Sequence, residues 1–159
     1  MDIVVQKIKE ILEDSFNGVS GIKQIYVEDP NFIPKSALPC IAIVPTGTEF
    51  NIADNARDIN TFSVEIRVIE DITNTLGRPG NEVAGTTELI EKMEARNENG
   101  QLKDNTVYKV IRDNLDLGED KRFKISNVGS ISYTAEVRQQ RVTKEAVFNV
   151  EIDLLVNRK

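Results

Sequence analysis

Alternation of hydrophobic and polar residues predicts two strands in the first half of the chain. Residues 38–45 form an apolar run closed at each end by proline, which is typical of a buried strand. In residues 61–68, every second side chain from Phe62 to Val68 is hydrophobic, and this pattern predicts a half-buried strand. Residues 46–60 between the two strands are polar and mixed in charge, so we expect a long loop there.

The remaining hydrophobic pattern completes a mixed arrangement of helices and strands. Helical spacing predicts an amphipathic helix over residues 2–16, and a short strand follows at 22–27. After the second strand of the pair described above we expect a polar connection at 70–85, helices at 86–96 and 105–115 (the second capped by Asp104), and strands at 126–137 and 145–156. The order α-β-β-β-α-α-β-β predicts an α+β fold, with a mainly antiparallel sheet flanked by helices on one face.

The last expected strand shows the strictest alternation. Every second residue of 146–156 is hydrophobic, so we expect this side to face the core, with Phe148 and Ile152 buried beneath the helices. The opposite side mixes polar residues with Val147 and Leu155. That side is therefore expected to be partly covered or to contact another chain.

Composition narrows the classes of function. A chain of 159 residues with 40% hydrophobic and 29% charged residues is expected to form one domain over residues 1–159. The net charge of −6 argues against binding nucleic acid through its phosphates, which requires an excess of lysine and arginine. Cys40, the single cysteine, lies within an apolar run and is expected to be buried. The first residues mix charges with apolar side chains, unlike a signal peptide, and we expect neither a membrane span nor an oxidising compartment.

Candidate catalytic chemistry is sparse. The chain has no histidine, the commonest general base and metal ligand, and we expect no enzyme activity, metal or cofactor. The carboxylates Glu65, Glu70 and Asp71 are candidates for catalysis. We expect them instead to be ordinary polar residues on a solvated strand face and at a strand end. The glycine-rich segment 80–87 resembles a phosphate-binding loop, but Thr86 stands where that loop needs lysine.

Two polar segments are candidates for contact with other protein chains. We expect residues 51–58 to form a subunit-contact arm, in which Arg57 either bridges to a carboxylate on a neighbour or pairs with Asp54 or Asp58 in its own loop. The segment 138–144 is a basic hairpin tip that could dock on an acidic protein surface, touch DNA phosphates or remain solvated. The candidate interface residues are Glu49, Asn51, Asp54, Asn55, Arg57, Asp58, Arg78, Arg138, Arg141 and Lys144.

With these elements placed, the sequence resembles the tail terminator proteins of tailed bacteriophages. The resemblance covers most of the chain, although the region from 85 to 120 carries little of it. It rests on the amphipathic opening helix, on Ile25-Tyr26-Val27 and the acidic, proline-containing segment after it, on Ile33-Pro34 and Leu38-Pro39 before the strand 40–45, on Asn55-Ala-Arg-Asp58 before the strand 61–68, and on the long closing strand.

The resemblance implies a structural virion protein of the tail and neck, assembled in the host cytoplasm. Members of that family form a homo-hexameric ring on the last ring of tail tube protein, end tube polymerisation and offer a surface to the head–tail connector protein, while DNA passes through the lumen as cargo. The polar loop from Thr73 to Gly85 departs from the pattern. Two alternatives stay open: another head–tail completion protein, and a cytoplasmic α+β ligand-binding or regulatory domain.

Overall fold

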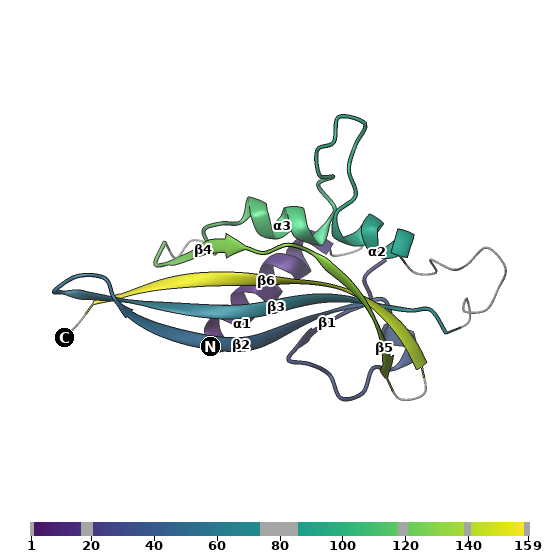
Figure 1. Ribbon diagram of the computed structural model, residues 1–159, viewed down its shortest axis with the longest axis horizontal. Helices are drawn as coiled ribbons and strands as arrows, with labels where there is room; N and C mark the ends of the chain where they lie inside the picture. The colour runs from purple at the N-terminus through teal and green to yellow at the C-terminus, as the bar shows by residue number, and fades with distance from the viewer. Residues whose placement is uncertain (1, 17–20, 74–85, 118–120, 139–140, 158–159) are drawn as a thin grey trace.

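In the part of the chain that the structure describes, a six-stranded sheet and three helices form the fold (Figure 1). The computed structural model describes residues 2–16, 21–73, 86–117, 121–138 and 141–157. The elements are α1 (Asp2–Phe16), β1 (Gln24–Val27), the 3₁₀ turn η1 (Lys35–Ala37), β2 (Cys40–Ile52), β3 (Arg57–Asp71), α2 (Thr86–Met93), α3 (Val107–Asp113), β4 (Phe123–Val128), β5 (Ser132–Arg138) and β6 (Arg141–Asn157). The strand order is β1-β2-β3-β6-β4, and β5 also pairs with β6.

The α+β class and the mainly antiparallel sheet are confirmed. Only β1 and β2 are parallel among the described strand pairs, and the long strands β2, β3 and β6 run side by side in the middle of the sheet. The helices α1, α2 and α3 pack on one side of this sheet. We call that side the helix face and the other side the open face.

The expected order of elements is wrong at one point, because the single strand expected at 126–137 is two strands. Both β4 and β5 pair with β6, but the register shifts by one residue between Ile125 and Asn127 and again before Ser132. Gly129 lies in the break, where a Cβ would come within 3.3 Å of the backbone oxygen of Asn149. The bulges bend the strand without changing its hydrophobic character, so the pattern alone does not reveal them.

A second correction concerns residues 46–60, which are not a long loop. Strand β2 continues to Ile52 and β3 begins at Arg57, so that only Ala53 to Ala56 connect them. The two strands pair without interruption from Gly47 to Ile52. This segment is polar and contains three asparagines, so its sequence does not show the hydrophobic alternation expected of a strand. Its backbone nevertheless pairs as two strands.

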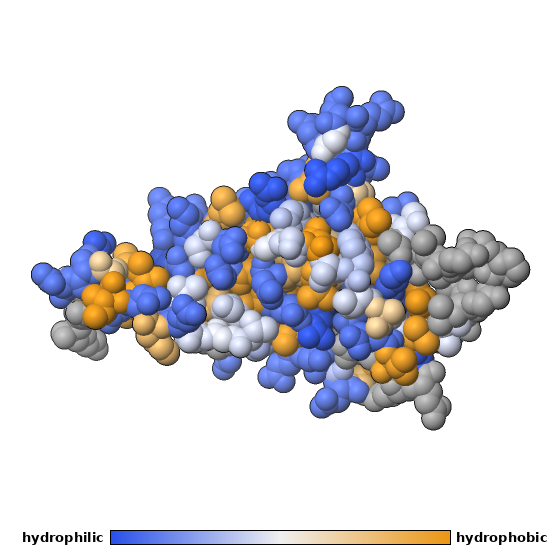
Figure 2. All heavy atoms as spheres, viewed as in Figure 1, coloured by the Kyte–Doolittle hydropathy of each residue, from blue (hydrophilic) through white to orange (hydrophobic). Residues whose placement is uncertain are grey.

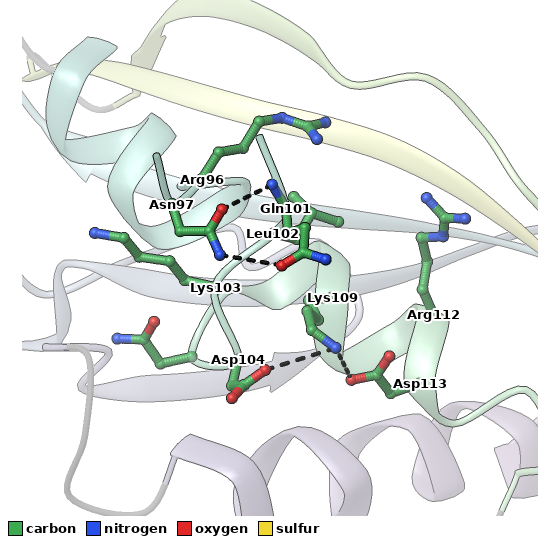
Figure 3. Close-up of a pocket in the computed structure, with 10 residues that line it drawn as sticks. Arg96, Asn97, Gln101, Leu102, Lys103, Asp104, Lys109, Arg112 and Asp113 are labelled. Carbon is green, nitrogen blue, oxygen red and sulfur yellow. Dashed lines mark hydrogen bonds and ion pairs between the residues drawn. The ribbon is translucent and has the colours of Figure 1, made fainter. Parts of the chain in front are cut away.

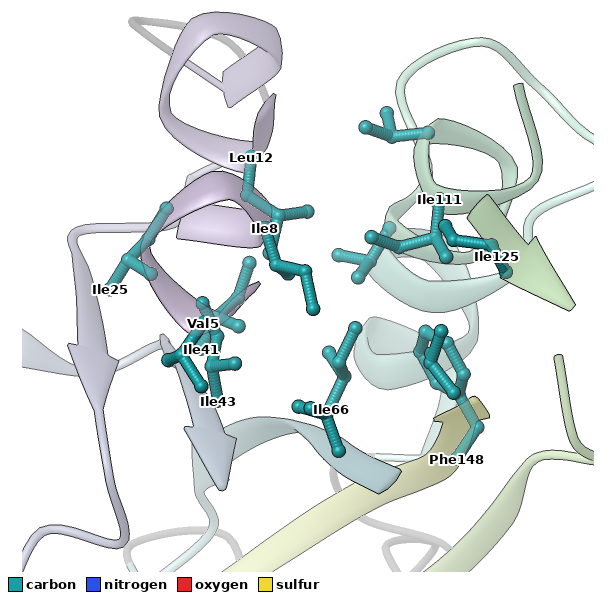
Figure 4. Close-up of a cluster of buried hydrophobic side chains, with 14 of the residues drawn as sticks. Val5, Ile8, Leu12, Ile25, Ile41, Ile43, Ile66, Ile111, Ile125 and Phe148 are labelled. Atoms are coloured by element: carbon teal, nitrogen blue, oxygen red, sulfur yellow. The ribbon is translucent and has the colours of Figure 1, made fainter. Parts of the chain in front are cut away.

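The core lies between the helices and the helix face of the sheet. Ile8 and Leu12 of α1 and Ile111 of α3 point toward Ile66 and Phe148 of the sheet (Figure 4). Phe148 is 1% exposed and Ile152 is fully buried, which confirms the predicted orientation of the closing strand. At its far end the prediction is wrong, because Val156 is exposed beyond the helices.

The open face is partly covered by the segment that leads from β1 to β2. Ile33 and Leu38 from this segment pack on Cys40, Ala42 and Ile69, so the predicted burial of Cys40 is confirmed.

An ionic group adjoins this smaller cluster. Arg67 pairs with Glu65, and its Nη1 lies 3.8 Å from the buried carboxylate of Glu145 and 3.4 Å from the exposed carboxylate of Asp29. One guanidinium therefore compensates several carboxylates on this face.

The helices in the second half are shorter than expected. The first ends at Met93 rather than near residue 96, and the second spans Val107–Asp113. Its N-cap is Thr106, not Asp104. Thr106 is buried, and its hydroxyl donates to the Lys103 carbonyl at 2.8 Å. The N-cap of this helix is therefore two residues later than the predicted N-cap, Asp104.

Candidate protein interface

The three long strands extend past the helices at one end of the sheet and form an arm. We define the arm as residues 46–52 of β2, 57–61 of β3 and 153–157 of β6. Across it, Ile52 pairs with Asp58, and Asp58 pairs with Val156. The arm is therefore a three-stranded ribbon, with its strand pairs fixed by backbone hydrogen bonds, and it projects from the body of the molecule (Figure 1).

A β-bulge sets which side chains face outward on the arm. The register of β2 against β3 shifts between Pro45 and Gly47, so Thr46 is an extra residue on β2. Before the bulge, Ile41 and Ile43 point to the helix face, and after it the even-numbered residues do. Without this extra residue, Phe50 and Ile52 of β2 would lie on the open face.

The helix face of the arm carries hydrophobic side chains that none of the described helices covers. Phe50 and Ile52 are each 76% exposed, and Val156 on β6 is 37% exposed. Figure 2 shows hydrophobic residues gathered at this end of the molecule. Exposed side chains of this size on adjacent strands form a patch that is typical of protein contact surfaces.

The outer edge of β2 along the arm is also open. Strand β1 pairs with β2 only as far as Ile43, and no other described strand pairs with residues 46–52 on that side. A row of backbone N–H and C=O groups is therefore available beside the exposed Phe50 and Ile52. Natural proteins usually protect such edges, or use them to bind another strand.

The tip of the arm is a turn closed by an internal ion pair. The Arg57 guanidinium contacts Asp54 through Nη2 at 2.6 Å and Nε at 2.8 Å, and the Ala56 N–H donates to the same carboxylate. The hydrogen bond from Arg57 lowers the pKa of Asp54 below its ordinary value. Of the two roles considered for Arg57, the structure contains the pair within its own loop. Glu49, Asn51 and Asn55 are exposed nearby.

The hairpin of β5 and β6 ends at the opposite end of the sheet. Val137 near its tip is 75% exposed, and Arg138 pairs in register with Arg141. The Arg141 guanidinium donates to the Ile33 carbonyl at 3.0 Å, so this residue anchors the hairpin to the body. Lys144 is half-buried and lies across from Glu70 on β3.

Basic residues near the hairpin also lower the pKa of Asp71 at the end of β3. Burial raises the pKa of Asp71, but hydrogen bonds from Thr73 together with Lys35 and Arg141 lower it on balance. The hairpin end is thus a local positive region on an acidic protein. The side chain of Arg138 and the whole of Arg78 lie outside the described residues.

A polar hollow of about 990 Å³ lies beside α3 (Figure 3). Lys109 points into it and pairs with Asp113 at 2.5 Å and Asp104 at 3.6 Å. The hydrogen bond with Asp113 raises the pKa of Lys109, so the amine stays protonated and is a poor base. The lining residues include no nucleophile beside a general base.

Two further features are candidate sites. Tyr133 donates to Glu94 at 2.5 Å, and its burial together with this contact raises its pKa. A groove of about 610 Å³ lies between the start of α1 and the strands, with Ile3, Val27 and Pro45 among its lining residues. The described residues contain no group of three metal-ligating side chains and no helix that is long and apolar enough to cross a bilayer.

The predicted contact residues fall into two groups at opposite ends of the sheet. Glu49, Asn51, Asp54, Asn55, Arg57 and Asp58 lie on the arm, and Arg138, Arg141 and Lys144 lie on the β5–β6 hairpin. The prediction missed Phe50, Ile52 and Val137, the exposed hydrophobic residues of these surfaces. Alternation along a strand shows which side chains share one side of it. It does not show whether that side is buried or exposed, so the exposure of these residues could not be predicted.

The glycine-rich segment 80–87, and with it most of the loop from Thr73 to Gly85, falls largely outside the described residues.

Comparison of the sequence with models of known protein families and with characterised proteins gives no match.

Proposed function

We propose that this chain is a structural protein of a phage tail, which caps the tail tube as a ring, ends tube polymerisation and presents a surface to the head–tail connector. The observation that carries the proposal is the arm, a three-stranded ribbon with exposed Phe50 and Ile52 and with an outer edge that no other described strand pairs with. A monomer gains nothing in stability from such a surface, whereas a subunit of an assembly buries it.

Charge and chemistry agree with this function. The sequence carries a net charge of −6, and an acidic lumen lets DNA pass without binding its phosphates. In the polar hollow beside α3, Lys109 is paired with Asp113. Both features also fit another head–tail completion protein, so the binding partner decides between the two.

Sedimentation of the purified chain with assembled tail tubes of the same phage tests the proposal. The chain should pellet with the tubes in an amount that depends on the number of tube ends, and shearing the tubes should increase that amount. Binding in proportion to total tube mass, or no binding under any condition, would contradict a capping role. Binding to purified connector but not to tubes would favour a different neck protein.

A small-ligand domain remains the second candidate because of the groove lined by Ile3, Val27 and Pro45. An apolar ligand would fill this groove and stabilise the folded state according to its concentration. A thermal-shift screen of apolar compounds tests whether a ligand binds in this groove and raises the melting temperature. A concentration-dependent stabilisation that Val27→Asp abolishes would favour this candidate.

A further inference from the structure

We propose that copies of this chain associate head to tail, with the open edge of β2 on the arm of one copy pairing with the open edge of β5 on the next. This inference deepens the proposed function, on which it rests for its biological meaning, by naming the contact that builds the ring. The two edges belong to the same sheet but lie at its opposite ends.

The two edges match in direction. Strand β2 is antiparallel to β3, β3 to β6 and β6 to β5, so β5 runs opposite to β2 within one copy. Two copies in the same orientation therefore bring the edges together as an antiparallel pair. Residues 46–52 and 132–138 each supply seven residues, and no other described strand pairs with either outer edge.

The side chains of the two edges also match. Tyr133 pairs with the buried Ala146, so the odd-numbered residues of β5, including the exposed Val137, point to the helix face. Phe50 and Ile52 point to the helix face of the arm. A continuous sheet across the two copies would place these hydrophobic side chains side by side.

Charge disfavours one of the neighbouring registers. When Phe50 lies opposite Val137, residues 49–52 pair with 135–138, and Glu49 lies opposite the basic residue Arg138. A shift of two residues would place Glu49 opposite Glu136, and like charges directly across a strand pair are destabilising. The arm carries three carboxylates and one guanidinium, whereas residues 136–144 carry three basic side chains and one acidic one. The surfaces are therefore complementary in charge.

The contact is heterologous, because each copy uses a different surface on each side. Such contacts close into a ring or continue as a filament, and they do not stop at a two-fold dimer. The rival arrangement, in which two arms pair with each other about a two-fold axis, uses Phe50 but not Val137. The two arrangements therefore respond differently to single substitutions.

Sedimentation velocity on the full chain, over concentrations up to its solubility limit and without tube protein, tests the inference. Phe50→Asp and Val137→Asp should each weaken self-association by about thirtyfold or more, as expected for residues at the centre of an interface. Phe32→Asp is the matched control, because Phe32 is 61% exposed and lies outside both edges. It should associate as the wild type does.

Mixing the two variants gives the decisive result. Each retains one intact edge, so an equimolar mixture of Phe50→Asp and Val137→Asp should form a dimer and nothing larger. Wild-type association by Val137→Asp on its own, with no dimer that contains both variants in the mixture, would overturn the inference in favour of the two-fold arrangement. A wild-type chain that stays monomeric at every concentration would also overturn it, yet end-specific binding to tubes would then leave the proposed function standing.

Discussion

Replacing Phe148 with alanine should lower the free energy of unfolding by about 3–5 kcal/mol. The side chain is 1% exposed in the middle of β6, and its ring meets that of Tyr108 edge-on at 5.2 Å with an interplanar angle of 72°. That ring pair accounts for about 0.5–1.5 kcal/mol of the loss, and the cavity and lost burial account for the rest. Neighbours on rigid strands cannot close such a cavity fully.

Urea denaturation followed by circular dichroism measures this loss. In a domain of this size the expected loss lowers the melting temperature by about 10 °C. Phe50→Ala is the matched control, because the same change at a side chain that is 76% exposed should alter stability by less than about 0.5 kcal/mol. Wild-type stability in Phe148→Ala, or an equal loss in Phe50→Ala, would refute the assigned faces of the sheet.

Three further predictions concern the arm tip, the Tyr133 contact and the bulge. Arg57→Glu should leave the circular dichroism spectrum unchanged and cost under about 1 kcal/mol in urea denaturation, because its pair with Asp54 is exposed; a larger loss would show a structural role. The pKa of Tyr133 is raised in the folded state, so its contribution to the free energy of unfolding is present below about pH 10 and is lost progressively above it. Tyr133→Phe should therefore reduce the decline of the unfolding free energy at alkaline pH. An unchanged decline would contradict this. Deletion of Thr46 should preserve the fold by circular dichroism but abolish self-association in sedimentation velocity, since Phe50 and Ile52 would move to the open face; unchanged association would contradict the bulge's role.

Much of the fold could be predicted because its core elements repeat with a clear period. Alternation from Phe62 to Val68 and from Ala146 to Ile152 identified the central strands and their buried sides. Local pattern does not report pairing between distant strands, so the bulges near Thr46 and Asn127 were not predicted. Each bulge depends on the partner strand rather than on the residues that form it.

The candidate contact residues predicted from the sequence lie on the arm and on the β5–β6 hairpin, but the exposed hydrophobic residues of these segments were not predicted. Polar residues such as Asp54 and Arg57 indicated an arm, but they stabilise its turn within the same chain. The exposed surface is hydrophobic, at Phe50 and Ile52 on one edge and Val137 on the other. A hydrophobic residue on an alternating strand is normally assigned to the core, and only the extent of the helix layer shows that these residues lie beyond it.

Negative-stain imaging of tail tube protein, polymerised with and without this chain, tests the central claim most directly. The account predicts shorter tubes in the presence of the chain, with a ring of additional density at one end of each tube. The variants Phe50→Asp and Val137→Asp should cap less well than Phe32→Asp, because a ring with broken contacts leaves the tube end open. Tubes of unchanged length and bare ends at saturating chain would contradict the account.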